Sequence, residues 1–98
     1  MNDISGVHLR RLPAFTTLVV RTMNSVYRVV ITLGPEVYIQ GGVFFRDPTR
    51  VFVDGASTGG ILKIGWIGVG LMVHIRSAGQ CIITSPVRAI TTERQRRI

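Results

Sequence analysis

Cysteine is nearly absent from the sequence, which contains only Cys81. One cysteine cannot form a disulfide within the chain, so secreted modules that depend on a disulfide framework are excluded. Cys81 begins an apolar run with Ile82 and Ile83, where a thiol usually packs as a small hydrophobic group. We therefore expect a reducing, cytoplasmic location and a fold stabilised by its hydrophobic core alone.

The glycine-rich segment 59–75 lacks a long apolar run. Its longest stretch without a charge or a histidine is Ile64–Val73. A membrane-spanning helix needs about 17–25 residues, so this stretch is too short and we expect no membrane partner. No basic region followed by an apolar block and a cleavage site is visible after Met1, so we expect no signal peptide.

Metal-ligand patterns are also absent. The two histidines, His8 and His74, the five carboxylates and the one cysteine show no spacing of the C-x-x-C or H-x-x-x-H kind. We therefore predict no metal ion.

The sequence contains the side chains of a nucleophilic site but not its motif. Ser57, Thr58 or Cys81 supplies a nucleophile, and His74 with Asp54 supplies a base and an orienting group. The nucleophile elbow G-x-S-x-G does not occur, and nothing in the sequence places these side chains together. We therefore predict that the protein is not an enzyme.

The glycines fit neither common nucleotide-binding motif. Gly55 and Gly60 have the spacing of the Walker pattern, but Ile61 stands where its Lys is needed. Residues 65–70 read G-x-x-G-x-G, the reverse of the dinucleotide fingerprint. We predict no cofactor, and these glycines instead suit bends and close backbone approach. Trp66 is expected at the edge of the core or at a subunit contact.

Valine and isoleucine dominate the apolar 46% of the chain. β-branched residues fit a pleated sheet better than a helix. Strands are predicted at about 15–23, 26–33, 37–45, 50–53, 61–65, 69–76 and 81–85. Turns are predicted at 24–25, 34–35, 47–49, 54–60 and 77–80, a turn or bulge at 66–68, and a bulge or sharp bend at Gly41-Gly42 inside the third strand. These hairpins predict an all-β fold, a small antiparallel barrel or compact sandwich of about seven strands.

Alternation along the strands predicts which side chains share a face. In the first strand Leu18, Val20 and Thr22 share one face, and Val19, Arg21 and Met23 share the other. The second strand has an apolar face of Tyr27, Val29, Ile31 and Leu33, and the inward positions expected in the sixth are Val69, Leu71, Val73 and Ile75. One domain covers residues 1–98, with 1–13 as a lead-in and 92–98 as a basic tail that we expect to fray. Pro86 is expected to end the last strand, with pairing resuming at an edge over 87–91.

The hairpin Val73–Pro86 resembles the second signature of the Sm-like RNA-binding barrels. That signature has an Ile-Arg-Gly turn, a hydrophobic strand and a proline. This chain has Ser77 after Ile75-Arg76, and it lacks the N-terminal helix and the Gly-then-Asp-Asn part of the first signature. No family is assigned and no site residue is transferred.

The net charge is +7, and arginine outnumbers lysine eleven to one. Arginine contacts phosphates well, and aromatic side chains stack on bases. The candidate nucleic-acid contacts are Arg28, Arg46, Arg50 and Arg76 with the basic tail and nearby aromatics. The alternative interpretation is a solvated face with a basic tail.

Several predicted strands are apolar on both faces, and unpaired edges of such strands are hazardous. We therefore expect a non-enzymatic binding or protein-interaction module that acts as a homo-oligomer. The alternative function is a nucleic-acid-binding small barrel that uses the arginines and exposed aromatics.

Overall fold

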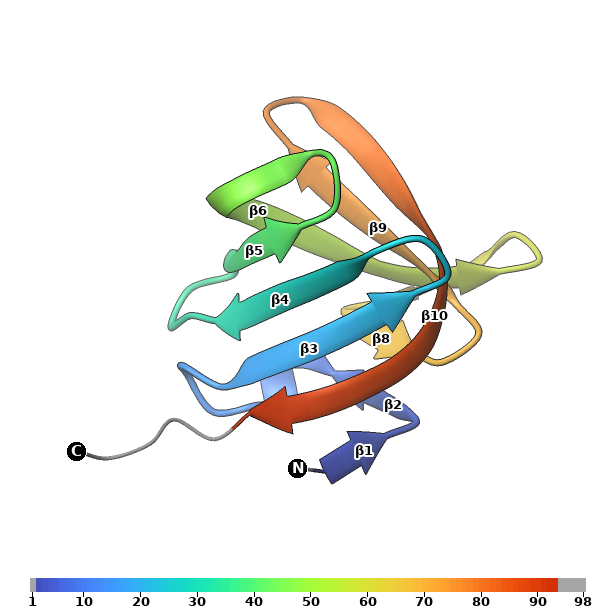
Figure 1. Cartoon of the computed structure of the whole chain (residues 1–98), viewed down its shortest axis with the longest axis horizontal. Helices are drawn as coiled ribbons and strands as arrows, with labels where there is room; N and C mark the ends of the chain where they lie inside the picture. Colours follow the sequence, from blue (N-terminus) through green and yellow to red (C-terminus); the bar gives the residue numbers. More distant parts are fainter. Residues whose placement is uncertain (1, 94–98) are drawn as a thin grey trace.

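The computed structural model describes residues 2–93, most of which lie in strands (Figure 1). The strands are β1 (Asn2–Ile4), β2 (Gly6–His8), β3 (Thr17–Thr22), β4 (Val26–Ile31), β5 (Val37–Gly41), β6 (Phe45–Thr58), β7 (Ile61–Ile64), β8 (Trp66–Gly68), β9 (Met72–Ser77) and β10 (Gln80–Glu93). One 3-10 turn, η1 (Leu9–Arg11), follows β2, and the described residues contain no α-helix. All strand pairs described are antiparallel, which confirms the predicted all-β antiparallel fold.

The strand pairings close into a ring. β3, β4, β5 and β6 pair in sequence, β6 pairs with β9, β9 with β10, and β10 with β3. Two strands of 14 residues make closure possible, because each pairs with different neighbours along its length. β6 pairs with β5 over residues 45–51 and with β9 over 52–57, whereas β10 pairs with β9 over 80–86 and with β3 over 87–93. Register shifts within both strands mark bulges, which let a strand bend.

The core lies inside this ring. In β3 the buried face is the one that contains Leu18 and Val20, which are 0% and 2% exposed, and in β4 it is the predicted apolar face, where Val29 is 2% exposed. Val73 and Ile75 of β9 face the same core, as predicted. Leu33 does not, because β4 ends at Ile31 and leaves Leu33 86% exposed. The β2–β8 ribbon adds Ile67, which is 1% exposed, so this ribbon is part of the packed structure.

The predicted bulge or sharp bend at Gly41-Gly42 is a full reversal of the chain, so the predicted third strand 37–45 does not continue through it. Gly41 pairs with Phe45, and residues 42–44 form the turn between β5 and β6. Both glycines have positive φ, 135° and 62°, and a Cβ on Gly41 would lie 2.1 Å from the carbonyl oxygen of Val26. A side chain here would clash with backbone, which is why glycine is needed.

The turn predicted at 47–49 and the turn or bulge predicted at 66–68 are wrong, and of the turn predicted over 54–60 only Gly59-Gly60 is a turn. Residues 47–49 and 54–58 lie within β6, and residues 66–68 form β8. Distant partners supply their hydrogen bonds, since β8 pairs with β2 and the end of β6 pairs with β7 and β9. Pro86 does not end β10, because it lies at a register shift, and its carbonyl accepts a hydrogen bond from the Met23 amide.

The ends of the chain are more structured than expected. The predicted lead-in 1–13 contains β1, β2 and η1, and β1 pairs with β10. Residues 92 and 93 of the predicted tail belong to β10. Residues 94–98, the rest of that tail, lie outside the described residues.

Candidate functional site

The β6–β7 hairpin projects from the ring (Figure 1). Thr58 pairs with Ile61, so the loop is the two residues Gly59 and Gly60, whose φ angles are 57° and 88°. Two positive φ values are what a tight type I′ hairpin turn requires. The turn therefore sends β7 back along the far end of β6, beyond the point where β5 has ended.

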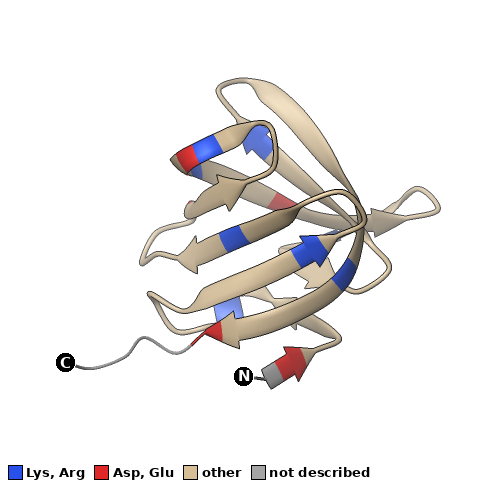
Figure 2. Ribbon diagram, viewed as in Figure 1, with Lys and Arg blue, Asp and Glu red and all other residues tan. Residues whose placement is uncertain are grey.

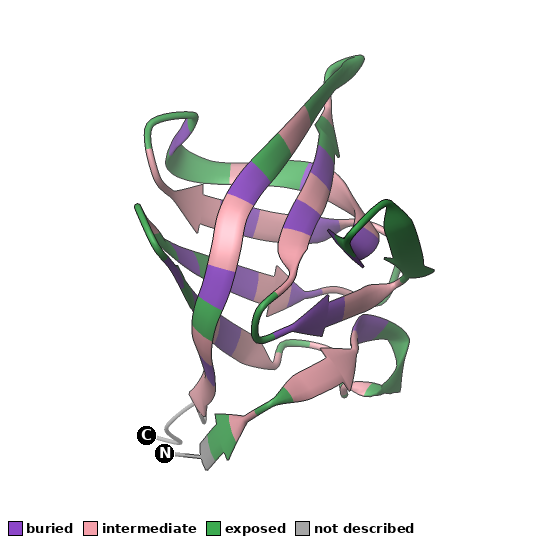
Figure 3. Ribbon diagram, turned by 90° about the vertical axis from the view of Figure 1, so that its right-hand side faces the viewer, coloured by how far each residue is buried: buried purple, intermediate pink, exposed green. Residues whose placement is uncertain are grey.

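β7 is an apolar strand that is exposed at every residue (Figure 3). Ile61 is 71%, Leu62 42% and Ile64 79% exposed. Within residues 2–93, β7 pairs only with β6, so its outer edge has no strand partner. Its one charged residue is Lys63, whose Nζ lies 5.6 Å from the centre of a Trp66 ring. β7 is therefore an exposed, mostly apolar edge on which Lys63 is the one charged side chain.

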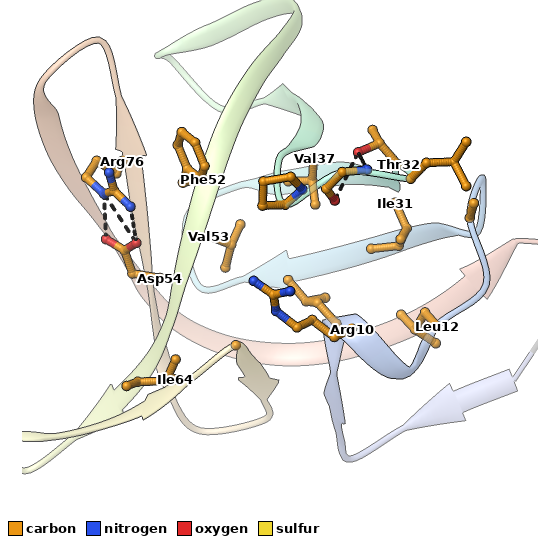
Figure 4. Close-up of a pocket in the computed structure, with 16 residues that line it drawn as sticks. Arg10, Leu12, Ile31, Thr32, Val37, Phe52, Val53, Asp54, Ile64 and Arg76 are labelled. Atoms are coloured by element: carbon orange, nitrogen blue, oxygen red, sulfur yellow. Dashed lines mark hydrogen bonds and ion pairs between the residues drawn. The ribbon is translucent and has the colours of Figure 1, made fainter.

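A cleft of about 670 Å³ opens where the edge of β6 changes partner (Figure 4). On that edge β5 ends at the Val37–Val51 pair, and β7 begins at the Gly55–Ile64 pair. Residues 52–54 of β6 line the gap between them, together with η1 and the β4–β5 connection. The change of partner thus leaves an opening in the wall of the sheet.

Two arginines contribute to this cleft. Arg76 donates hydrogen bonds from Nε and Nη2 to both carboxylate oxygens of Asp54, at 3.0–3.3 Å, and its guanidinium lies 4.7 Å from the Phe52 ring centre. The hydrogen bonds to Asp54 raise the pKa of Arg76 above its ordinary value. Arg10 is exposed and points into the cleft, and it forms no ion pair with the residues that the structure describes (Figure 4).

The four arginines predicted to contact nucleic acid lie on three strands: Arg28 on β4, Arg46 and Arg50 on β6, and Arg76 on β9 (Figure 2). Three of them have a carboxylate partner in this chain. Arg28 lies 2.5 Å from Glu93, Arg76 pairs with Asp54, and Arg50 lies 3.9 Å from Glu36.

Arg50 has a second partner. It donates a hydrogen bond to the Tyr38 hydroxyl at 2.9 Å, and this bond raises the pKa of Arg50. Arg46 has no ion pair within residues 2–93, and its carbonyl accepts from the Gln40 side chain. The paired arginines are partly neutralised, so they offer less charge to a phosphate.

Trp66 is half-buried on β8, opposite His8 of β2. It lies over two glycines of this ribbon, since a Cβ on Gly6 or Gly68 would come within 2.5 or 2.8 Å of its ring. Glycine at both positions therefore makes room for the indole. Its role at a subunit contact stays a prediction.

The structure brings together one pair that the sequence could not. The Ser57 hydroxyl and His74 Nε2 lie 2.5 Å apart across the β6–β9 pair. Asp54, the third member of the possible nucleophilic site, bonds Arg76 instead.

Cys81 is exposed, contrary to the expectation that it packs as a small hydrophobic group. No cluster of metal-ligating side chains occurs in residues 2–93.

Sequence reasoning missed both the cleft and the exposed edge. The cleft depends on which strand pairs with which part of β6, and no local pattern shows this. The apolar residues on both faces of 61–64 were the available signal for the edge.

No protein-family model, curated protein or solved structure matches the chain. Within residues 2–93, the structure has no helix of the length and hydrophobicity that a membrane span requires.

Proposed function

We propose that the protein is a non-enzymatic protein-interaction module that forms a homo-oligomer through β7. One observation carries this proposal: β7 is apolar but exposed over its whole length. An exposed apolar edge is a template for pairing with another strand. A second copy of the chain supplies a matching strand, and a two-fold arrangement lets each copy cover the other.

The sequence of β7 favours one register for this contact. When identical strands pair antiparallel about a two-fold axis, one residue lies opposite its own copy. Placing Lys63 at that position would oppose two like charges, which destabilises a sheet. Placing Leu62 there opposes two leucines and sets Lys63 against Ile61 of the second copy. We therefore propose the Leu62 register, which gives the strand order β6–β7–β7–β6.

Light scattering at micromolar concentration tests this proposal. We expect a mass above that of one chain for the wild type, and the mass of one chain for Leu62→Lys, because two lysines would then face each other. Ile83→Lys on β10 is the matched control, since Ile83 is a comparably exposed apolar strand residue, 53% against 42%. A monomeric wild type, or equal effects of the two variants, would contradict the proposal.

Nucleic-acid binding is a second candidate, with an adjusted set of contacts. Arg21 on β3 and Arg88 on β10 are exposed on adjacent strands, and neither has an ion pair within residues 2–93 (Figure 2). Arg88 occupies the bulge beside Arg21, between Val87 and Ala89. Unpaired arginines on one face are better suited to phosphates than the ion-paired ones.

Fluorescence anisotropy with labelled single- and double-stranded DNA at two salt concentrations tests this candidate. Phosphate contact predicts an affinity that falls steeply with salt. The double variant Arg21→Gln and Arg88→Gln is expected to bind more weakly than Arg50→Gln, because Arg50 is already held by Glu36 and Tyr38. Absence of binding at low salt would eliminate the candidate.

A cytoplasmic location belongs to the same proposal. Cys81 is exposed and is the only cysteine of the chain. In an oxidising compartment an exposed thiol is open to disulfide exchange with other chains, whereas a reducing one preserves it.

A further inference from the structure

We propose that the cleft between β5 and β7 binds a small carboxylate with an apolar body, and that Arg10 holds the carboxylate. The observation behind this is independent of the oligomer contact. An arginine without an ion partner among residues 2–93 projects into a concave space whose lining combines apolar side chains with a similar amount of polar surface (Figure 4). Small-molecule sites likewise combine apolar side chains with polar groups that fix the orientation of the ligand.

The lining of the cleft suits an apolar body. Leu9, Ile31 and Val37 belong to the buried core and also line the cleft, so a ligand there would touch the core itself. Leu33 and Ile64, which also line it, are 86% and 79% exposed. A ligand that covers these two side chains removes apolar surface from water, which favours binding.

The charge of the cleft suits a monoanion. Arg76 and Asp54 are bound to each other through both carboxylate oxygens, so together they add no net charge. Arg10 is the remaining charged residue of the lining. The cleft therefore carries one positive charge, which a single carboxylate balances and a phosphate dianion would exceed. A guanidinium also matches a carboxylate geometrically through two parallel hydrogen bonds.

The backbone that carries Arg10 is fixed in place. The Leu9 amide donates to the Gly65 carbonyl at 2.9 Å, which joins η1 to the end of β7. The Arg10 amide lies 3.3 Å from Nδ1 of His8, the residue that begins this turn. Because the Leu9 and Arg10 amides are both bonded, the backbone under the Arg10 side chain is held in place, and less ordering is needed on binding.

Octanoate is a suitable probe, with 1-octanol as its neutral counterpart. Each is titrated into the ¹⁵N-labelled protein and followed by the amide signals of cleft residues, including Arg10, Gly34 and Gly65. We expect octanoate to shift these signals at lower concentration than octanol. Arg10→Gln should weaken octanoate binding by about tenfold or more, the size of a charged hydrogen bond.

Two further variants separate the site from general effects. Arg11→Gln removes an equal charge from the neighbouring position of η1, which is not part of the lining, and should leave octanoate binding unchanged. Leu33→Glu places a carboxylate at the mouth, where Leu33 is exposed and its replacement is compatible with folding, and should weaken binding. The spectra themselves report whether each variant is folded.

The proposal is overturned by any of three results. These are equal binding of octanoate and octanol, equal effects of Arg10→Gln and Arg11→Gln, and signal shifts that are absent or confined to β7. Signal shifts on β7 alone would indicate adsorption to the exposed edge rather than binding in the cleft. Failure of the carboxylate proposal would not affect the proposal of an oligomer contact through β7, because that contact is tested by the mass of the protein without any ligand.

Discussion

The Ser57 hydroxyl and the His74 imidazole are hydrogen-bonded across the β6–β9 pair, with Oγ and Nε2 2.5 Å apart. Ser57 is 7% exposed, so the bond satisfies a polar group that water scarcely reaches. The carboxylate that would orient the imidazole in a catalytic triad, Asp54, is bonded to Arg76. We therefore interpret the pair as structural.

Replacing Ser57 tests this interpretation. Ser57→Ala should lower the free energy of unfolding by about 1 kcal/mol, the typical net value of one hydrogen bond, as measured by urea denaturation. Ser77→Ala, at a partly buried serine, is the control. Hydrolysis of p-nitrophenyl acetate should stay at the buffer rate for the wild type. A faster rate that Ser57→Ala abolishes would show a nucleophile instead.

Gly55, like Gly41, should not tolerate a side chain. Its φ is 152°, and a Cβ would lie 2.1 Å from the Lys63 carbonyl oxygen, a backbone atom that cannot rotate away. Gly55→Ala should cost about 3 kcal/mol or more of unfolding free energy. Gly70→Ala, at φ 86° with open space around it, should cost only about 1–2 kcal/mol. Equal costs would argue against the close β6–β7 approach.

Ile67 should anchor the β2–β8 ribbon to the ring. Its side chain is 1% exposed, so Ile67→Ala leaves a cavity and should cost about 2–5 kcal/mol in thermal or urea unfolding. Ile83→Ala, at a position 53% exposed, should change stability by only about 0.5 kcal/mol. If Ile67→Ala were equally mild, the ribbon would not be part of the core.

The Arg76–Asp54 pair should respond to salt but not to pH near neutrality. The hydrogen bonds to Asp54 raise the pKa of Arg76 in the folded protein. Protonated Arg76 therefore contributes stability at any pH below the pKa of the unfolded guanidinium. This contribution is lost only as the pH rises through the higher pKa of the folded state. Over roughly pH 6–9 the contribution is therefore constant. The Arg76 side chain is 53% exposed, so solvent screens the pair, and Asp54→Asn should lower the free energy of unfolding only slightly, and less still at high salt. A cost that varied across this pH range would contradict the assignment.

The sequence predicts the local part of this fold and misses the long-range part. Alternation correctly groups Leu18 with Val20 on one face and correctly predicts that Ile75 points inward, because side chains along a strand alternate between two faces. The same reasoning cannot find that β6 continues through Asp47-Pro48-Thr49, since the partners that hold it there are elsewhere in the chain. Turn-forming composition is a weak guide when a strand is held by neighbours on its edges.

The candidate site shows the same division. The apolar residues of β7 and the outward arginines are visible in the sequence, but their surroundings are not. The partner carboxylates of Arg28 and Arg76 lie 65 and 22 residues away. Such pairing decides whether an arginine is available to a ligand, and it follows only from the topology. Arg10 shows this, because nothing in the sequence marks it, and only the topology places it in the cleft without an ion partner among residues 2–93.

Closure of the ring through β10 has a consequence for how the chain reaches its fold. β10 pairs with β1, β3 and β9, so it joins the first strand of the described chain to two later ones. During synthesis, β3 to β6 can form hairpins as they emerge, but β1 has no partner until residues 90–92 have been made. Folding that depends on such distant pairs is slow. Until then, apolar strand edges remain open, so the nascent protein is most prone to aggregation just before its ring closes.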